Sequence, residues 1–190
     1  PSFTSSATFS AAENQTSIGT VTATDADGDD LTYSISGSEI SISSSGVLTF
    51  VSAPDYETQS TYTATVTVSD GVNSTTQSIT VNVTNVNEIG SFTSSSTFSV
   101  TENQTAIGTV EASDPDGDTI TYSLSGTDAD SLNINSTSGV LTFVAAPDYE
   151  NKSSYSAEVI ASDGTYASAQ TISITVVNLN DNDPSFTSSA

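Results

Sequence analysis

The sequence VTNVNEIGSF at residues 83–92 decides how the rest of the chain is divided. A second version, VVNLNDNDPSF, stands at residues 176–186. Each version follows a run in which apolar and polar residues alternate, and each leads into a new Ser- and Thr-rich stretch. Two versions of one joint indicate a repeated unit, and a repeat has to be recognised first because it defines the fold.

Four further motifs recur in the same order in both halves of the chain. They are ENQT at 13–16 and 102–105, DADGD at 25–29 with DPDGD at 114–118, APDYE at 53–57 and 146–150, and SDG at 69–71 and 162–164. The first two pairs are 89 residues apart and the last two are 93 apart, so the second half has four additional residues. They lie between Gly126 and Gly139, where we expect a loop.

The repeats predict two domains, at residues 1–88 and 89–183, and the start of a third at 184–190. The heptapeptide PSFTSSA opens the chain and returns at residues 184–190. A unit of about 90 residues has the size of an immunoglobulin-like sandwich. We therefore expect two units of a longer array. The chain has no apolar run long enough to span a membrane and no signal peptide, so we expect any membrane attachment to lie outside this sequence.

The charge balance is strongly acidic. The chain has 23 Asp and Glu residues, no histidine and one basic residue, Lys152, for a formal net charge of −22. Such a surface has no basic patch to neutralise phosphate, which excludes nucleic acids and anionic lipid surfaces as partners. The chain also has no cysteine, so disulfides and thiolate metal ligands are absent.

The alternation of side chains predicts an all-β fold. Residues 62–68 and 78–83 alternate apolar and polar side chains with a period of two, as strands with one buried face do. The other expected strands of the first unit lie near residues 8–11, 17–24, 31–36, 39–42 and 47–51, and no amphipathic helix is evident. The predicted fold is therefore two tandem seven-stranded Greek-key β-sandwiches of the immunoglobulin-like type.

The apolar positions of this alternation form the expected core. In the first unit they are Val21, Ala23, Leu31, Tyr33, Ile35, Leu48, Phe50, Tyr62, Ala64, Val66, Val68, Ile79, Val81 and Val83. In the second unit they include Val110, Tyr122, Leu124, Leu141, Phe143, Tyr155, Val159, Ile172, Ile174 and Val176.

The acidic residues do not follow the alternation and collect where strands end. Because strand ends of a sandwich gather at two poles, we expect the pole that ends the first unit and the pole that begins the second to face each other across the joint. The seven carboxylates expected there are Glu13, Asp55, Glu57, Glu88, Asp114, Asp116 and Asp163. Like charges about 4 Å apart repel by roughly 1 kcal/mol per pair in water and about 4 kcal/mol at an effective dielectric constant of 20. Such a cluster needs a cation, and its oxygen ligands suit Ca²⁺ better than Mg²⁺, while the lack of His and Cys argues against zinc and copper.

Both units resemble cadherin repeats, and the resemblance covers the whole chain. NLNDNDPSF at residues 178–186 is similar to the cadherin linker pattern DxNDNxPxF, with Asn in place of the first Asp. Glu13 and Glu102 resemble the glutamate near the family's linker. The other matches are the DxE pair at 55–57 and 148–150, the DxD pair at 25–27 and 114–116, and the aspartate of the AxDxG segment at Asp70 and Asp163. The resemblance implies a Ca²⁺-stiffened module of an adhesive or spacer array.

The resemblance also implies about three Ca²⁺ ions at the central joint. The implied ligands of the outer ion are Glu13, Asp55, Glu57 and Glu88. Those of the middle ion are Glu13, Glu57, Glu88, Asp116 and the Val86 carbonyl. Those of the third ion are Asn87, Asp114, Asp116, Asp163 and the Ile89 carbonyl. The far pole of the second unit carries a matching set in Glu102, Asp148, Glu150 and Asp181. The central joint departs from the family pattern in Glu88 for Asp, Ile89 for Asn and the missing proline.

Other functions would use some of the same residues. A Ca²⁺-dependent carbohydrate-binding module stays open, although Tyr56, Tyr149 and Tyr166 are too dispersed to form an aromatic platform. An acid and base pair at Asp55 and Glu57, as in a glycosidase, is disfavoured because the motif is duplicated and lacks a cleft signature, so no enzyme is expected. A local Ca²⁺ loop of the EF-hand kind, counted from Asp25, would need a glutamate at its twelfth position, where the chain has serine.

The expected partners are neighbouring repeats of the same array, with another copy of the chain or a polysaccharide left open. The expected location is extracellular or at a cell surface. The composition, which is rich in Ser, Thr and Asp and lacks Cys, resembles bacterial cadherin-like arrays.

Overall fold

The structure is a computed structural model that describes residues 1–183. The chain forms two compact units, the first from Pro1 to Val86 and the second beginning at Asn87. The sequence placed this boundary between residues 88 and 89, and the exact domain limits stay a prediction. The expected third unit at residues 184–190 lies outside the described residues. Within residues 1–183, no helix has the length and apolar character needed to cross a membrane.

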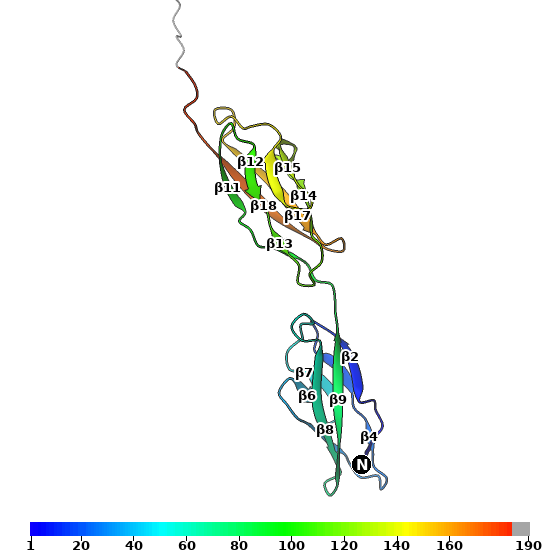
Figure 1. Ribbon diagram of the computed structural model, residues 1–190. Coiled ribbons are helices and arrows are strands. Elements are labelled where there is room, and N and C mark those ends of the chain that lie inside the picture. Colours follow the sequence, from blue (N-terminus) through cyan, green and yellow to red (C-terminus); the bar gives the residue numbers. More distant parts are fainter. Residues whose placement is uncertain (184–190) are drawn as a thin grey trace, which may run out of the picture. The chain divides into compact units, whose positions relative to one another are not determined.

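The first unit consists of strands that run along its length, so that its loops collect at two ends (Figure 1). The strands are β1 (Ser2–Phe3), β2 (Thr8–Ala12), β3 (Ser17–Thr20), β4 (Ala23–Thr24), β5 (Thr32–Ile35), β6 (Ile40–Ile42), β7 (Val47–Phe50), β8 (Thr61–Ser69) and β9 (Ser74–Thr84). They form a four-stranded sheet in the order β2-β9-β8-β5, a three-stranded sheet in the order β3-β7-β6, and a short pair of β1 with β4. The first strand of the large sheet, β2, runs parallel to the last strand, β9, from the pair Thr8–Thr80 to the pair Ala12–Thr84.

The second unit repeats this arrangement strand for strand. Its elements are β10 (Ser91–Phe92), β11 (Thr97–Thr101), β12 (Ala106–Thr109), β13 (Ala112–Ser113), β14 (Thr121–Ser125), η1 (Ala129–Ser131), β15 (Leu132–Ile134), β16 (Val140–Phe143), β17 (Ser154–Ser162) and β18 (Ala167–Val177). The sheets have the orders β11-β18-β17-β14, β12-β16-β15 and β10-β13. The predicted fold, two tandem β-sandwiches with seven main strands each, is confirmed.

The core of each unit lies between its two sheets and follows from the alternation along the strands. Leu48, Val66 and Val68 are fully buried, and Ile79 is 1% exposed. Every residue of the predicted core is either buried or packed against a buried cluster. The pattern of one buried face per strand is what a two-sheet sandwich requires.

Two features differ from the sequence-based expectation. The strand expected at residues 17–24 is divided, because β3 pairs with β7 whereas β4 pairs with β1. The additional residues of the second unit form the 3₁₀ turn η1, which is too short to leave a helical pattern in the sequence. The loop before η1 is fixed to the large sheet by Asp128, whose backbone N–H donates to the Ser156 carbonyl at 3.1 Å.

Candidate metal centres

Glu13 is the buried carboxylate at the end of the first unit, with 2% of the residue exposed. It follows β2 directly, and the left-handed backbone of Asn14 (φ 61°) turns the chain away after it. One carboxylate oxygen accepts the backbone N–H of Tyr56 at 2.7 Å, and the other accepts the backbone N–H of Val86 at 2.7 Å. Glu13 therefore ties the 53–57 loop and the last residue of the unit to one carboxylate.

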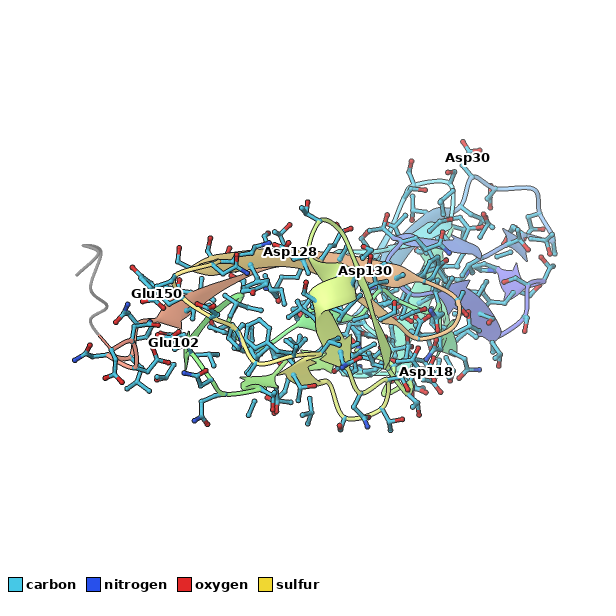
Figure 2. All side chains as sticks on the ribbon, turned by 90° about the horizontal axis from the view of Figure 1, so that it is seen from above. Asp30, Glu102, Asp118, Asp128, Asp130 and Glu150 are labelled. Carbon is cyan, nitrogen blue, oxygen red and sulfur yellow. The ribbon has the colours of Figure 1, made fainter. Side chains whose placement is uncertain are left out.

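Glu102 has the same role in the second unit, where it is 1% exposed. Its two oxygens accept the backbone N–H groups of Tyr149 at 2.8 Å and Leu179 at 2.7 Å. One carboxylate oxygen each from Glu102, Glu150 and Asp181 lie within 4.8 Å of one another. Figure 2 shows Glu102 and Glu150 at one end of this unit and Asp118 at the other. Lys152, two residues after Glu150, pairs with Asp128 instead, so this set of three hard oxygens suits Ca²⁺.

Asp55 and Asp148 are turned toward their own loops. The Asp55 carboxylate accepts the backbone N–H of Thr58 at 3.0 Å and its hydroxyl at 3.0 Å, and these hydrogen bonds lower the pKa of Asp55. The Asp148 carboxylate accepts the backbone N–H of Asn151 at 3.3 Å. Each aspartate therefore shapes the turn that presents the neighbouring glutamate.

The second unit begins with its own group of predicted ligands. The Asn87 side-chain amide donates to Asp163 Oδ2 at 2.9 Å, and the Glu88 backbone N–H donates to Asp116 Oδ2 at 2.7 Å. The Asp116 backbone N–H in turn donates to Asp114 Oδ1 at 3.0 Å. The backbone of Glu88, which the sequence grouped with the first unit, is thus held by the loop that carries Asp114 and Asp116.

Asp114 provides the test of whether this group fits a cation. Its Oδ2 atom is buried and accepts no hydrogen bond from the described residues. A buried carboxylate oxygen without a partner raises the free energy of the folded state by several kcal/mol. A bound cation removes most of this cost. The residues present therefore fit a hard divalent cation at this end of the second unit.

The Asp163 side chain is held as an anion by three donors. The Asn87 amide, then the backbone N–H of Tyr166 at 2.6 Å, and then that of Thr165 at 2.6 Å lower the pKa of Asp163. A lowered pKa means that the folded unit gains stability from this carboxylate above the pKa of the unfolded chain and loses it as the pH falls. The carboxylate is therefore charged at neutral pH, as a metal ligand has to be.

The first unit begins with the equivalent aspartates. One carboxylate oxygen each from Asp25, Asp27 and Asp29 lie within 4.8 Å of one another. The α-amino group of Pro1 lies 3.0 Å from Asp25 Oδ2 and lowers the pKa of Asp25. Asp25 and Asp27 occupy the positions that Asp114 and Asp116 have in the second unit.

Val86 and Ile89 complete the predicted set. Both side chains are exposed, at 42% and 53%, on either side of the pair Asn87–Glu88. Their assigned role uses only the backbone carbonyl, and it stays a prediction, as does the ligand role of each residue above.

Asparagine side chains form a part of these centres that the sequence analysis missed. The Asn85 amide donates to Glu57 Oε1 at 3.0 Å, and the Asn178 amide donates to Glu150 Oε1 at 2.9 Å. In addition, the Asn103 amide donates to Asp181 Oδ2 at 2.6 Å. The sequence feature that could have revealed these contacts is the asparagine at 85 and 178, where the cadherin pattern has aspartate. An amide donor there orients the glutamate carboxylate without adding a like charge.

Replacing Asn178 by aspartate is expected to destabilise the second unit when Ca²⁺ is absent. Asn178→Asp removes a donor to Glu150 and puts a second carboxylate in its place. The thermal midpoint in EGTA should fall, and the loss should shrink as NaCl is raised because salt screens exposed charges. Asn133→Asp, at an exposed position of β15, adds the same charge elsewhere and serves as the control. An equal loss in both variants would contradict a specific role for Asn178.

The fold and the two ends of each unit together define a class of protein. Each unit is a Greek-key β-sandwich with a buried glutamate at the pole where the chain leaves it. The family model for the cadherin domain matches residues 7–84 and 96–179. The chain therefore belongs to the cadherin domain family, in which Ca²⁺ binding is typical.

Individual relatives agree with this assignment. The chain is 32% identical over 166 residues to cadherin-4 of Gallus gallus, covering 75% of this chain and 18% of that protein. It is 38% identical over 107 residues to chitinase A of Pseudoalteromonas piscicida, covering 54% of this chain and 13% of that protein. The crystal structure of human protocadherin-24 EC1-2 (Form II) matches with a TM-score of 0.71 and 25% identity, covering 94% of this chain and 99% of that one. The chain spans less than a fifth of the length of cadherin-4 and of chitinase A.

Proposed function

We propose that this chain is a Ca²⁺-binding tandem module of an extracellular or cell-surface protein, in which ions at the joint between the units stiffen an adhesive or spacer array. The observation that carries the proposal is the buried glutamate of each unit. Glu13 and Glu102 each join the 53–57 or 146–150 loop to the segment that leads out of the unit. Binding at such a carboxylate acts on the exit of the chain directly.

The proposal places about three Ca²⁺ ions between the end of the first unit and the start of the second. Residues 85–90 connect β9 to β10 outside any strand, and assigned ligands of both units follow one another in this stretch. Glu13, Asp55, Glu57 and the Val86 carbonyl would contribute from the first unit. Asn87, Glu88, the Ile89 carbonyl, Asp114, Asp116 and Asp163 would contribute from the second. When bound, Ca²⁺ supplies the positive charge that these carboxylates otherwise lack.

Titration of single variants tests the ligand assignment. Glu57 and Asp116 are each assigned to two ions. Replacing a residue that only supports a metal ligand already lowers metal affinity by about 10–100-fold. Glu57→Ala and Asp116→Ala should therefore weaken Ca²⁺ binding by at least about 100-fold. Asp30→Ala removes the same charge from an exposed loop position and should change the affinity little. Isothermal titration calorimetry measures all three. Equal losses in the three variants would show a diffuse ion atmosphere and refute the assigned ligands.

The partners of the module follow from the same proposal. Neighbouring repeats would bind through the acidic poles, and Glu102, Asp148, Glu150 and Asp181 would form the joint with a following unit. A second copy of the chain is a further candidate partner. Bacterial origin remains part of the proposal, supported by the composition and by the match to a bacterial chitinase.

The carbohydrate-binding alternative has little support in the described residues. Tyr149 and Tyr166 are exposed at 38% and 48%, but they lie beyond opposite ends of β17. They therefore cannot form one stacking platform, and Tyr56 belongs to the other unit. The family assignment also favours a structural module over a catalytic one.

A further inference from the structure

In the second unit, an ammonium group is held between a carboxylate and an aromatic ring. Lys152 Nζ forms an ion pair with Asp128 Oδ1 and lies 4.6 Å from the centre of the Tyr155 ring. Asp128 Oδ2 accepts the backbone N–H of Ser156 at 2.8 Å, and the bond with Lys152 is the main cause that lowers the pKa of Asp128. The Tyr155 ring thus makes a cation–π contact with a lysine of its own unit.

The first unit has the same ring without the lysine. Tyr62 packs edge-on against Phe50 with centroids 5.0 Å apart and planes at 65°, and Tyr155 packs against Phe143 at 4.9 Å and 65°. Three residues before the tyrosine, Lys152 is replaced by Gln59, whose amide donates to the Thr61 carbonyl at 3.0 Å. The loop that carries Asp128 is absent from this unit.

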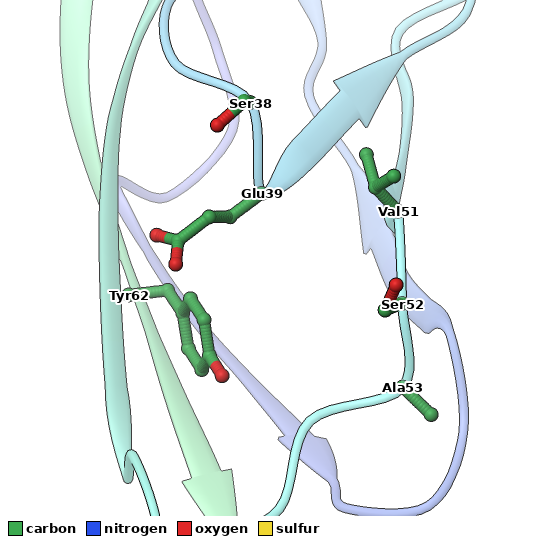
Figure 3. A pocket seen from close by; sticks show the side chains of 6 residues that line it. All are labelled: Ser38, Glu39, Val51, Ser52, Ala53 and Tyr62. Atoms are coloured by element: carbon green, nitrogen blue, oxygen red, sulfur yellow. The ribbon is translucent and has the colours of Figure 1, made fainter.

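A pocket opens beside Tyr62 in the first unit, with a volume of about 250 Å³. Its lining residues are Ser38, Glu39, Val51, Ser52, Ala53 and Tyr62. Figure 3 shows the Glu39 carboxylate pointing toward the Tyr62 ring, with Val51, Ser52 and Ala53 on the opposite wall. Val51 is 61% exposed, so an apolar surface is available next to the charge.

The pocket contains the Glu39 carboxylate, and no basic side chain of the first unit offsets its charge. Lys152 is the only basic residue in the sequence, and it belongs to the second unit. Within residues 1–183, the Glu39 carboxylate accepts no hydrogen bond and joins no ion pair. Burial raises the pKa of Tyr62, and the charges of Glu39 and Asp55 raise it further.

We propose that this pocket binds a primary alkylammonium group, supplied by a lysine side chain of a partner protein. The ammonium would pair with Glu39 and lie over the Tyr62 ring, as Lys152 pairs with Asp128 and lies over Tyr155. The methylene groups of the lysine would contact Val51 and Ala53, because such stems pack on apolar surface while the charged end pairs. A matching pocket of about 340 Å³ lies beside Tyr155 in the second unit, with Ser131 in the place of Glu39, so the glutamate that would pair with the ammonium belongs to the first unit.

Titration with a model lysine tests the proposal. Nα-acetyl-lysine-N-methylamide is added to the intact chain with Ca²⁺ saturating, and the NMR signals of Tyr62 and Glu39 are followed. Saturable shifts at these residues are expected in the millimolar range, and none with the Nε-acetylated form, which has no charge. n-Butylammonium is the second probe. If it binds more weakly than the model lysine, the pocket also recognises the peptide groups of a lysine residue, as expected for a partner protein. If both bind equally, any alkylammonium suffices, and the assignment to a partner protein is overturned.

Two pairs of variants separate the pocket from general acidity. Glu39→Gln should weaken binding by about fivefold, whereas Asp30→Asn, with the same charge loss, should not. Gln59→Lys should abolish binding by supplying an internal ammonium, and Lys152→Gln should create binding at Tyr155. Tyr62→Phe keeps the ring and should bind as the unchanged chain does. Shifts spread over many acidic residues, or binding unaffected by both Glu39→Gln and Gln59→Lys, would overturn the proposal whether or not the Ca²⁺ assignment holds.

Discussion

Removal of Ca²⁺ by EGTA is expected to lower the thermal midpoint of the chain by about 10–20 °C for each occupied site and to widen the range of angles between the units. Binding to the folded state alone stabilises it by about 2.7 kcal/mol per site at a hundredfold excess over Kd. In a domain of about 100 residues, 1 kcal/mol shifts the midpoint by roughly 4–8 °C. Calorimetry measures the midpoint, and small-angle X-ray scattering measures the spread of conformations.

Screening of charge has to be separated from site binding in that experiment. NaCl at the ionic strength of the Ca²⁺ buffer screens the same carboxylates but cannot bridge them. It should therefore restore only a small part of the lost stability. Melting and scattering curves that superimpose with and without Ca²⁺ would remove the basis for a stiffening role.

Replacing Gly139 by alanine is expected to destabilise the second unit by about 2–5 kcal/mol. Gly139 has a φ of 68°, and a Cβ atom there would lie 2.0 Å from the Val110 carbonyl oxygen. The left-handed conformation costs an alanine about 1–2 kcal/mol, and a steric clash in a packed region typically costs a further 1–3 kcal/mol. Urea unfolding in EGTA, where the unfolding of each unit can be followed, measures the loss.

Gly164 provides the matched control for this substitution. Its φ is 97°, but a Cβ atom there would meet nothing within 4 Å. Gly164→Ala should therefore lose only the conformational part, about 1–2 kcal/mol. Gly46 holds the place of Gly139 in the first unit, with a Cβ position 2.2 Å from the Val21 carbonyl oxygen, so Gly46→Ala should destabilise that unit instead. Equal losses at Gly139 and Gly164 would refute the steric argument.

The strands and the core could be predicted because each strand has one buried face, which the sequence records directly. The expected run at residues 62–68 is contained in β8, and every predicted core side chain of the first unit is buried or packed on the buried cluster. The division of residues 17–24 could not be predicted in this way. It depends on which strand pairs with each half, and the local pattern of Val21 and Ala23 is the same in both cases.

The candidate site was only partly accessible from the sequence. Glu13, Asp116 and Asp163 could be named because carboxylates that recur at strand ends have no other evident use. The asparagine donors at 85 and 178 were missed because an exposed amide has no distinguishing pattern, and their contacts to Glu57 and Glu150 depend on a loop brought close by the fold. The pocket at Tyr62 was missed for a related reason: the sequence placed that ring in the core, whereas the structure leaves it half-buried.

The parallel pairing of β2 with β9 determines how each domain responds to a pulling force. Tension in an array enters a domain just before Thr8 and leaves it just after Thr84, at opposite ends of this pair. The two strands are then pulled lengthwise past each other, so the hydrogen bonds from Thr8–Thr80 to Ala12–Thr84 share the load and must break together rather than one after another. Tension reaches β2 through β1, whose pair with β4 has only two residues, Ser2–Thr24 and Phe3–Ala23, so this pair can open first and lengthen the chain before the sandwich itself gives way.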